Sequence, residues 1–373
     1  MKKTGGGLIR VGLIGPVLPY RGGIAQHTTM LHRTLRAKVD LLSVSFKRLY
    51  PKWLYPGKTV LDSGYKGHKE DGVAYDLDPL NPVTWEKVCR RFIKHAPQTV
   101  IIPWWTVFCT PCYLSICSYL RQKGVKILFL CHNVVEHEMT EWKMTASKLV
   151  LSQGSRFFTH SEAEAARLKA LIPKAEISTY PHPVYHKFQG PLVKHGRRAK
   201  LELLFFGLVR PYKGLDILIE AMYQLRKEDI FLTIAGEWWY KDESLKSRIQ
   251  SVKDRIEVVD RYITEGETAT FFDRADVIVL PYRNATGSGV IPLAYHYGKP
   301  VITTTVGGLP EVVVDGVSGR LVKPEDPDAL AKVLQEFLLM DPASMHEGVR
   351  KTAESMTWEG LAECILNGIE KNI

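Results

Sequence analysis

The feature that most constrains the fold of this chain is a series of short, continuously hydrophobic segments separated by segments with helical periodicity. Strands that are covered on both faces of a parallel sheet are hydrophobic throughout, and helices connect them. In the first half, the predicted strands are 8–14, 39–44, 99–103 and 125–130, and the predicted helices are about 24–37, 84–95 and 113–123. This alternation predicts an α/β fold with a parallel, doubly wound sheet.

The same alternation restarts after 182–200, a polar and basic segment with two prolines that is typical of a linker. The predicted strands are then 201–206, 230–235, 256–259, 276–280 and 300–305, and the predicted helices are about 214–227, 242–254, 266–274 and 289–297. A chain of 373 residues is also long for one domain. We therefore predict two Rossmann-like domains, 1–190 and 191–356, with the carboxyl ends of their strands lining a cleft.

A loop with two cations follows the first predicted strand of the second domain. In "LLFFGLVRPYKGLDILIEAM" (203–222), the strand ends near Gly207, and Arg210 and Lys213 precede a helix. Two fixed cations at a strand end can neutralise a diphosphate, and can stabilise it further when it leaves with additional charge. A basic loop exposed to water remains the alternative.

A second loop, in "PYRNATGSGVIPLAYHYGKP" (281–300), contains no carboxylate. Thr286, Gly287, Ser288 and Gly289 stand at the start of a predicted helix. Free N–H groups and the positive end of the helix dipole favour phosphate oxygens at such a position, and glycine allows the backbone to approach closely. We predict that residues 286–289 bind a phosphate group.

Four segments together resemble the retaining GT-B glycosyltransferases of family 4. They are "FFGLVRPYKGLDILIEA", "IAGE" (234–237), "RADVIVLPYRNATGSG" (274–289) and "YGKPVITTTVGGLPEVVVDGVSGRLV" (297–322). The resemblance implies a GT-B fold, a nucleotide-diphosphate sugar as donor, and no metal or other cofactor. It implies that Arg210 and Lys213 hold the diphosphate, and that a helix at 357–373 crosses back to the first domain.

The chain departs from the family pattern at two places. Most members carry arginine directly after the glycine of the first motif, where this chain has Leu208 and places its arginine two residues later. Members also carry two glutamates seven residues apart, and those positions are Ala285 and Leu293 here. These glutamates contact the transferred sugar and the ribose in the family, so both contacts are in doubt.

Other donor contacts are expected from the remaining motifs of the second domain. Glu237 ends "TIAGE" at a strand terminus, where it could bind a sugar hydroxyl. Tyr262 and Ile263 lie in the segment against which the family packs the nucleotide base, although plain packing of Tyr262 is an equal alternative. The resemblance does not distinguish a UDP-sugar from a GDP-sugar.

The first domain carries two further matches to the family. "GLIGPVLPYRGGIAQHTTML" (12–31) lacks the dinucleotide fingerprint spacing and resembles the glycine-rich loop that approaches the donor phosphates, with Gly22 and Gly23 as the matching residues. Arg21 and His27 are weaker matches. His132 follows a predicted strand where a family histidine lies close to the transferred sugar, and it is our third candidate catalytic residue.

Candidate acceptor contacts in the first domain rest on weaker patterns. Trp104 and Trp105 end a predicted strand and could stack on an acceptor sugar or face lipid, while aromatic packing is an equal alternative. His137 and Glu138 follow His132 on the same loop.

The positive charge is concentrated at the beginning of the chain. The net charge is +10, and residues 1–60 hold eleven Lys and Arg and one Asp. The segment 45–58 mixes these cations with aromatic residues, a combination that binds anionic membrane surfaces, although an ordinary solvated loop is an equal interpretation. We do not expect nucleic acid as a partner.

No apolar run reaches the roughly 18 residues of a membrane span, and we expect a cytoplasmic protein, peripheral at the inner face of the membrane at most.

Together these features predict a retaining glycosyltransferase. It would transfer a sugar from a nucleotide-diphosphate sugar to a glycan or lipid-linked acceptor, in polysaccharide or glycoconjugate biosynthesis. Two alternatives remain: a catalytically silent homologue that binds nucleotide sugars, and another GT-B-type enzyme such as a nucleotide-sugar epimerase.

Overall fold

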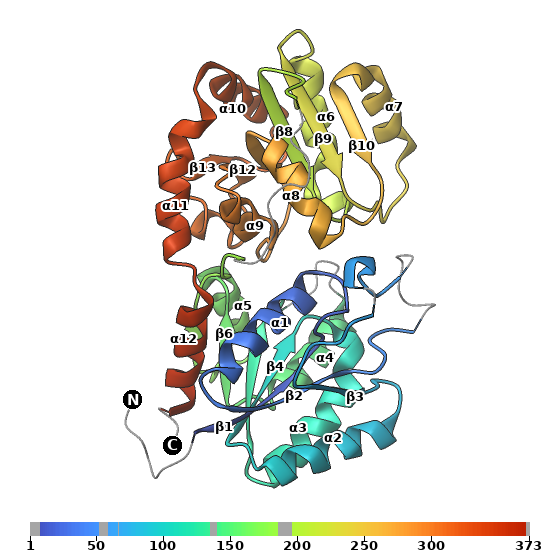
Figure 1. Cartoon of the computed structure of the whole chain (residues 1–373), viewed down its shortest axis with the longest axis vertical. Helices are drawn as coiled ribbons and strands as arrows, with labels where there is room; N and C mark the ends of the chain where they lie inside the picture. Colours follow the sequence, from blue (N-terminus) through green and yellow to red (C-terminus); the bar gives the residue numbers. More distant parts are fainter. Residues whose placement is uncertain (1–7, 52–58, 66, 135–139, 186–195, 371–373) are drawn as a thin grey trace. The chain divides into compact units, whose positions relative to one another are not determined.

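The computed structural model describes residues 8–51, 59–65, 67–134, 140–185 and 196–370, which divide into two compact α/β units (Figure 1). Unit 1 comprises Met1–Pro181 and Trp358–Ile373, and unit 2 comprises His182–Thr357. The first boundary lies before the predicted position at 190. The segment after Pro181 associates with unit 2, because the Val184 amide donates a 2.8 Å hydrogen bond to the Met356 carbonyl.

Unit 1 is built on a seven-stranded sheet in which each described pair of neighbours is parallel, with the order β3-β2-β1-β4-β5-β6-β7. The strands are β1 (Arg10–Ile14), β2 (Asp40–Phe46), β3 (Val73–Leu77), β4 (Thr99–Trp104), β5 (Lys126–Cys131), β6 (Arg156–Thr159) and β7 (Ile177–Thr179). The central strands β4 and β5 are buried along almost their whole length, which explains their continuous hydrophobicity.

Helices cover both faces of this sheet, as right-handed crossovers between parallel strands require. The helices α2 (Pro82–His95), α3 (Thr110–Gln122) and α4 (Glu141–Leu151) pack side by side (Figure 1). The helix α1 (Gly23–Arg36) packs against α12 (Trp358–Glu370), and α5 (Glu162–Leu171) packs against β6 and β7. The predicted return of the last helix to the first unit is therefore present.

The core of unit 1 contains most of the cysteines of the chain. Five cysteines are buried and form no disulfide: Cys89, Cys109, Cys112, Cys117 and Cys131. Burial raises the pKa of the Cys89 thiol to about 11, so that it stays protonated and unreactive near neutral pH. These thiols therefore contribute to packing.

Unit 2 is built on a six-stranded parallel sheet with the order β10-β9-β8-β11-β12-β13. The strands are β8 (Leu201–Phe206), β9 (Ile230–Ala235), β10 (Ile256–Val259), β11 (Val277–Leu280), β12 (Val301–Thr304) and β13 (Gly319–Val322). This is the doubly wound order in which the chain reverses direction between β8 and β11. Ligands of such sheets bind near the carboxyl ends of the strands at this reversal.

The helices of unit 2 again form two groups. The helix α6 (Leu215–Gln224) packs against α7 (Glu243–Ser251) and α10 (Pro327–Leu339), whereas α9 (Val290–His296) packs against α11 (His346–Glu354) and α8 (Glu265–Arg274) contacts β8. Several helix starts are fixed by the sequence. Asp242 and Asp326 each accept a backbone N–H of their helix, and Thr264 and Glu267 form a capping box.

Candidate functional site

Lys213 lies in the loop that follows β8, in a short 3-10 turn, Pro211–Lys213. The turn ends at Gly214, which has φ 66°, and a Cβ on this residue would lie 2.0 Å from the Pro281 carbonyl oxygen. Glycine alone satisfies both conditions. The tight turn leaves the Lys213 side chain buried, with 8% of its surface exposed.

The surroundings of Lys213 are apolar and electropositive. Its Nζ lies 5.5 Å from the centroid of the Tyr282 ring, and 3.3 Å from the position of a Cβ added to Gly207. Burial, and then the nearby charge of Arg210, lower the pKa of Lys213 to about 7. Within the described ranges, no carboxylate forms an ion pair with Lys213. An ammonium group held in this way favours an anionic ligand that restores its charge.

Arg210 precedes the same turn and stacks on an aromatic ring from the loop that follows β9. The centre of its guanidinium group lies 4.4 Å from the centroid of the Trp239 ring, and the Trp239 indole N–H donates a 3.1 Å hydrogen bond to the Glu237 carboxylate. Backbone hydrogen bonds from Val209 to Glu237 and from Trp239 to Val209 join the two loops. No described carboxylate pairs with Arg210. Two cations without an acidic partner among the described residues thus lie in the loop after β8, which is hydrogen-bonded to the loop after β9.

The loop after β11 is tied to the loop after β8 by Arg283. Its guanidinium group donates to both carboxylate oxygens of Asp216, at 2.8 and 2.5 Å, and its backbone N–H donates to the Tyr212 carbonyl at 2.7 Å. A bidentate pair of this kind fixes orientation as well as distance. The two loops predicted to bind phosphate groups are therefore held against each other.

Residues 286–289 combine a buried side chain with an open backbone. Thr286 is 6% exposed, whereas a Cβ added to Gly287 would meet no atom within 4 Å. The Ser288 hydroxyl accepts the Val290 amide at 3.3 Å and lies 3.4 Å from the Tyr282 hydroxyl. Because α9 has only seven residues, its dipole is small, and any phosphate contact here would depend on the loop N–H groups themselves.

The two positions that lack the family glutamates are packing positions in this chain. Ala285 is 0% exposed and Leu293 is 8% exposed. Gly307 packs against Ala285 so closely that a Cβ would lie 1.7 Å from the Ala285 carbonyl oxygen. An ionised carboxylate at either position would be costly without a partner. The local packing therefore explains why apolar residues stand there.

The predicted base-binding pair divides into a buried and a half-buried residue. Ile263 is 6% exposed and packs inside unit 2, so its prediction as a direct ligand contact is not supported by its burial. Tyr262 is half-buried and retains surface for a ligand.

In unit 1, the glycine pair precedes and begins α1. Gly22 has φ 100°, which favours glycine, and a Cβ added to Gly22 or Gly23 would meet no atom within 4 Å. The backbone at this loop is therefore open to a ligand, as the resemblance implies.

The two tryptophans differ in exposure. Trp104 is the last residue of β4, is 1% exposed and belongs to the core of unit 1, so its prediction as an acceptor contact is wrong. Trp105 is half-buried and donates a 2.9 Å hydrogen bond to the Tyr50 hydroxyl. His137 and Glu138 lie outside the described residues.

The basic and aromatic segment 45–58 is described only up to Pro51. There, Phe46 and Leu49 are buried, Tyr50 accepts the hydrogen bond from Trp105, and Arg48 pairs with Asp78 at 2.7 Å. The described part thus packs its hydrophobic side chains into unit 1. The remaining basic and aromatic residues, 52–58, lie outside the described ranges.

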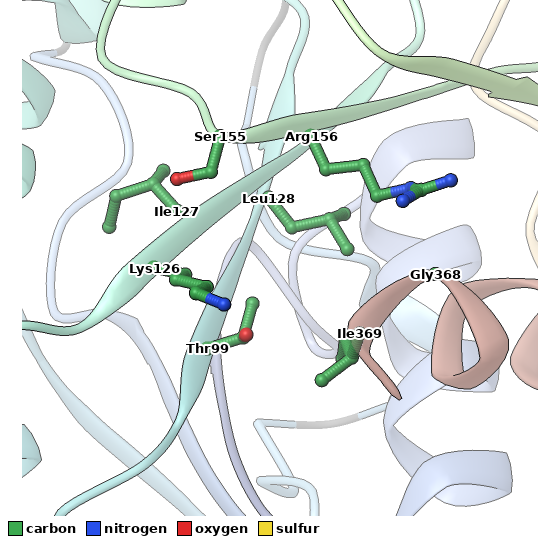
Figure 2. A pocket seen from close by; sticks show the side chains of 8 residues that line it. All are labelled: Thr99, Lys126, Ile127, Leu128, Ser155, Arg156, Gly368 and Ile369. Atoms are coloured by element: carbon green, nitrogen blue, oxygen red, sulfur yellow. The ribbon is translucent and has the colours of Figure 1, made fainter. Parts of the chain in front are cut away.

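A small pocket lies at the amino ends of the strands of the unit 1 sheet (Figure 2). Its lining comes from the start of β4 and of β5, from the start of β6 and the residue before it, and from α12: Thr99, Lys126, Ile127, Leu128, Ser155, Arg156, Gly368 and Ile369. Because ligands of doubly wound sheets bind at the carboxyl ends of the strands, we do not assign the donor to this pocket.

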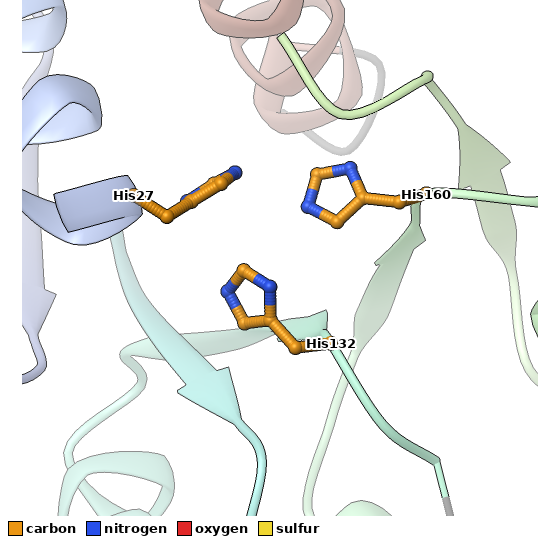
Figure 3. A group of neighbouring side chains, drawn as sticks. All are labelled: His27, His132 and His160. Atoms are coloured by element: carbon orange, nitrogen blue, oxygen red, sulfur yellow. The ribbon is translucent and has the colours of Figure 1, made fainter. Parts of the chain in front are cut away.

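His132 stands at the carboxyl edge of the same sheet, together with two histidines from distant segments (Figure 3). It directly follows β5, His160 directly follows β6, and His27 comes from α1. The ring centroids lie 4.6 Å apart for His27 and His132, 4.9 Å for His27 and His160, and 5.2 Å for His132 and His160. The sequence identified His132 by resemblance, but the spacing of the three residues did not indicate a cluster.

Residues 200–339, within unit 2, match the model of the family described as "Glycosyl transferases group 1". D-inositol 3-phosphate glycosyltransferase of Mycolicibacterium gilvum is 28% identical over 223 residues, which are 57% of this chain and 48% of that protein. The protein of the same name from Streptomyces scabiei is 31% identical over 220 residues, 54% of this chain and 48% of that protein. The chain spans about half the length of these curated relatives.

The matches to solved structures cover residues of both units. Sucrose-phosphate synthase from Thermosynechococcus elongatus gives a TM-score of 0.73 at 19% identity, over 97% of this chain and 98% of that one. HepE from Anabaena, in complex with UDP-glucose, gives a TM-score of 0.73 at 14% sequence identity. The match covers 97% of this chain and 99% of that one. At such identities the likeness concerns the fold, and it confirms the predicted GT-B fold. Among the described helices, none has both the length and the apolar character needed to cross a membrane.

Proposed function

We propose that this chain is a retaining glycosyltransferase that uses a nucleotide-diphosphate sugar. The match of residues 200–339 to the group 1 glycosyl transferase family and the GT-B fold support the proposal. The acceptor would be a glycan or a lipid-linked saccharide. One observation carries the proposal: Arg210 and Lys213 lie in the loop after β8 without a described acidic partner. Two such cations match the charge of a diphosphate.

The proposed reaction forms one bond and breaks one bond at the anomeric carbon of the donor. The acceptor hydroxyl oxygen bonds to this carbon on the same face from which the diphosphate departs, and the hydroxyl proton passes to a phosphate oxygen. The negative charge on the leaving diphosphate is greater in the transition state than in the bound donor. Arg210 and Lys213 would stabilise it there, which accelerates the reaction rather than only strengthening binding.

The remaining donor contacts follow from the geometry of each unit. In unit 2, the open backbone at Gly287, the Ser288 hydroxyl and the Glu237 carboxylate are the candidates for the phosphate, ribose and sugar oxygens, and Tyr262 is the candidate for the base. In unit 1, the open glycine loop and His132 are the family-based candidates for the donor phosphates and the transferred sugar.

The test is a comparison of donor binding and transfer in matched variants. A thermal-shift screen against UDP, GDP, ADP and their sugars first identifies the donor, because ligands that bind the folded state raise its melting temperature. Arg210→Ala and Lys213→Ala should then weaken donor binding by about 10-fold or more each. Lys227→Ala, which removes an exposed cation of the same unit, is the control and should leave binding unchanged. Unchanged donor affinity and transfer rate in both site variants would refute the proposal.

A catalytically silent nucleotide-sugar-binding protein is the second candidate. The observation that favours it is the burial of Ala285 and Leu293, because neither position can supply a carboxylate to the donor sugar or ribose. This alternative predicts donor binding with neither transfer nor slow donor hydrolysis. An epimerase would instead produce an isomerised nucleotide sugar in the absence of any acceptor.

A further inference from the structure

We propose that His27, His132 and His160 form a binding site for a divalent transition-metal ion of the zinc class. The three side chains each offer one ligating nitrogen, and these atoms all lie within 4.8 Å of one another. All three residues belong to unit 1, and the test below measures metal binding rather than transferase activity.

The arrangement of the rings suits a shared ion. The interplanar angles are 83° and 60° for the two pairs that include His27, which meet edge to face, and 42° for the tilted pair His132–His160, so no two of the rings stack (Figure 3). A tetrahedral ion with metal–nitrogen bonds of about 2.0–2.1 Å requires its ligand atoms to be about 3.4 Å apart. Side-chain rotations that bring the nitrogens up to about 1.4 Å closer would complete the site.

The tautomer of His160 is set as it is in metal-binding histidines. Its Nδ1 lies 3.0 Å from the Tyr180 carbonyl oxygen, which accepts but cannot donate, so Nδ1 carries the proton. Nε2 is then the unprotonated nitrogen of the ring. Histidine ligands commonly donate their other N–H to a backbone carbonyl in this way, which orients the ring and increases its basicity.

The two other ligands are also held from outside the cluster. The His132 amide donates to the Trp104 carbonyl at 2.9 Å, and the Val134 amide donates to the buried Glu164 carboxylate at 2.9 Å, so the backbone on both sides is anchored. His27 is 0% exposed and its ring lies 4.8 Å from that of Trp358 on α12. The ligands are therefore positioned by the fold before any ion binds.

The chemistry of the ligands defines the class of ion. Three imidazoles suit Zn²⁺, Co²⁺, Ni²⁺ and Cu²⁺, whereas Mg²⁺ and Ca²⁺ prefer oxygen ligands. Three protein ligands also leave a fourth coordination position for water or an anion. We expect no selectivity for Mg²⁺ at this site.

Cobalt titration of the full chain tests the proposal, because Co²⁺ in a four-coordinate nitrogen site absorbs strongly in the visible range. Chelator-treated protein should bind one Co²⁺ with such a band, and Zn²⁺ should displace it. His27→Gln and His160→Gln should each weaken binding by about 100-fold. The exposed His68 of unit 1 provides the control, and His68→Ala should bind Co²⁺ as the parent protein does.

Two outcomes would overturn the site. One is the absence of a saturable one-to-one cobalt spectrum in the parent protein, and the other is unchanged binding in folded His27→Gln and His160→Gln. If these variants do not fold, anomalous diffraction from parent crystals grown with Zn²⁺ decides the question. A peak between the three rings supports the site, and the lack of a peak there excludes it.

Discussion

The guanidinium group of Arg210 lies over the indole ring of Trp239, 4.4 Å from its centroid. Through its own N–H, this indole is also bonded to Glu237. A guanidinium group that stacks on an aromatic face keeps its positive charge. Its N–H groups point outward in the guanidinium plane, where they can donate to a ligand. The stacking thus orients Arg210 and leaves its positive charge unpaired by Trp239. An acidic partner in the same place would neutralise that charge.

Replacement of this indole should weaken nucleotide binding. We expect Trp239→Ala to raise the dissociation constant of the donor nucleotide by about 3- to 10-fold, since a cation–π contact of about 1 kcal/mol is lost and Arg210 gains freedom. Trp239→Phe should retain most of the affinity because the ring face remains. Isothermal titration calorimetry measures both variants, and equal losses in the two would show that the indole N–H matters instead.

The lowered pKa of Lys213 should make donor binding depend on pH. In the free protein this pKa is about 7, so Lys213 is mainly neutral above pH 8 and mainly charged at pH 6. A nucleotide-diphosphate sugar does not titrate in this range and binds the charged form more tightly. Its affinity should therefore fall by up to about 10-fold between pH 7.5 and 8.5.

The same coupling predicts that binding takes up protons at pH 8. The apparent binding enthalpy should vary with the ionisation enthalpy of the buffer in the parent protein. In Lys213→Arg, whose side chain stays charged, both this variation and the loss of affinity with pH should disappear. A donor affinity that is flat between pH 6 and 8.5 in the parent protein would contradict the assignment.

Lys213 should also make the free energy of unfolding depend on pH. An unfolded lysine has a pKa of about 10.4, so between pH 7 and 10 the unfolded state binds more protons than the folded state. The free energy of unfolding therefore rises with pH across this window, by on the order of 3 kcal/mol from this group. Lys213→Met should be more stable than the parent at pH 7 by a similar amount, while losing donor affinity.

Urea denaturation of both proteins at several pH values measures this difference. The stability of the two should converge as the pH approaches 10. Because other groups titrate equally in both proteins, their difference isolates Lys213. Curves that run parallel from pH 7 to pH 10 would show that Lys213 is not desolvated.

The tight turn at Gly214 should be intolerant of any side chain. Gly214→Ala combines a left-handed backbone conformation, costing about 1–2 kcal/mol, with a clash against the Pro281 carbonyl, so we expect a loss of more than about 2 kcal/mol. Gly266→Ala is the matched control, because this glycine lies in α8 and an added Cβ meets no atom within 4 Å. It should be neutral or should stabilise by up to about 1 kcal/mol. Thermal unfolding measures the change in stability of both variants, which should be a loss for Gly214→Ala and no change or a gain for Gly266→Ala.

Among the described strands, the sequence predicted most of the inner ones and also the edge strand β10, and it missed β3, β6, β7 and β13. β8 and β11 are hydrophobic throughout because helices cover both sides of the sheet. The strands β3, β7 and β13 lie at sheet edges, and β6 has four residues that begin with an arginine. Edge and short strands carry polar or small residues, so they do not produce a continuous hydrophobic run.

The candidate site was predictable where it depends on one loop and not where it depends on distant segments. Arg210 and Lys213 could be placed because a strand end and a helix start bracket them in the sequence. His27 and His160 come near His132 only through the order of strands in the sheet, which local patterns do not reveal. Trp104 was misjudged because the strand continues through it, and its side chain therefore points into the core.

The position of α12 has a consequence for the order in which the protein is made. This helix completes unit 1, where Trp358 packs on His27, yet the ribosome synthesises it after the whole of unit 2. During synthesis, the surface of α1 that α12 covers therefore stays uncovered until unit 2 has been synthesised. Unit 2 can fold in that interval. A nascent chain that stops before residue 358 contains the whole of unit 2 but lacks the last helix of unit 1.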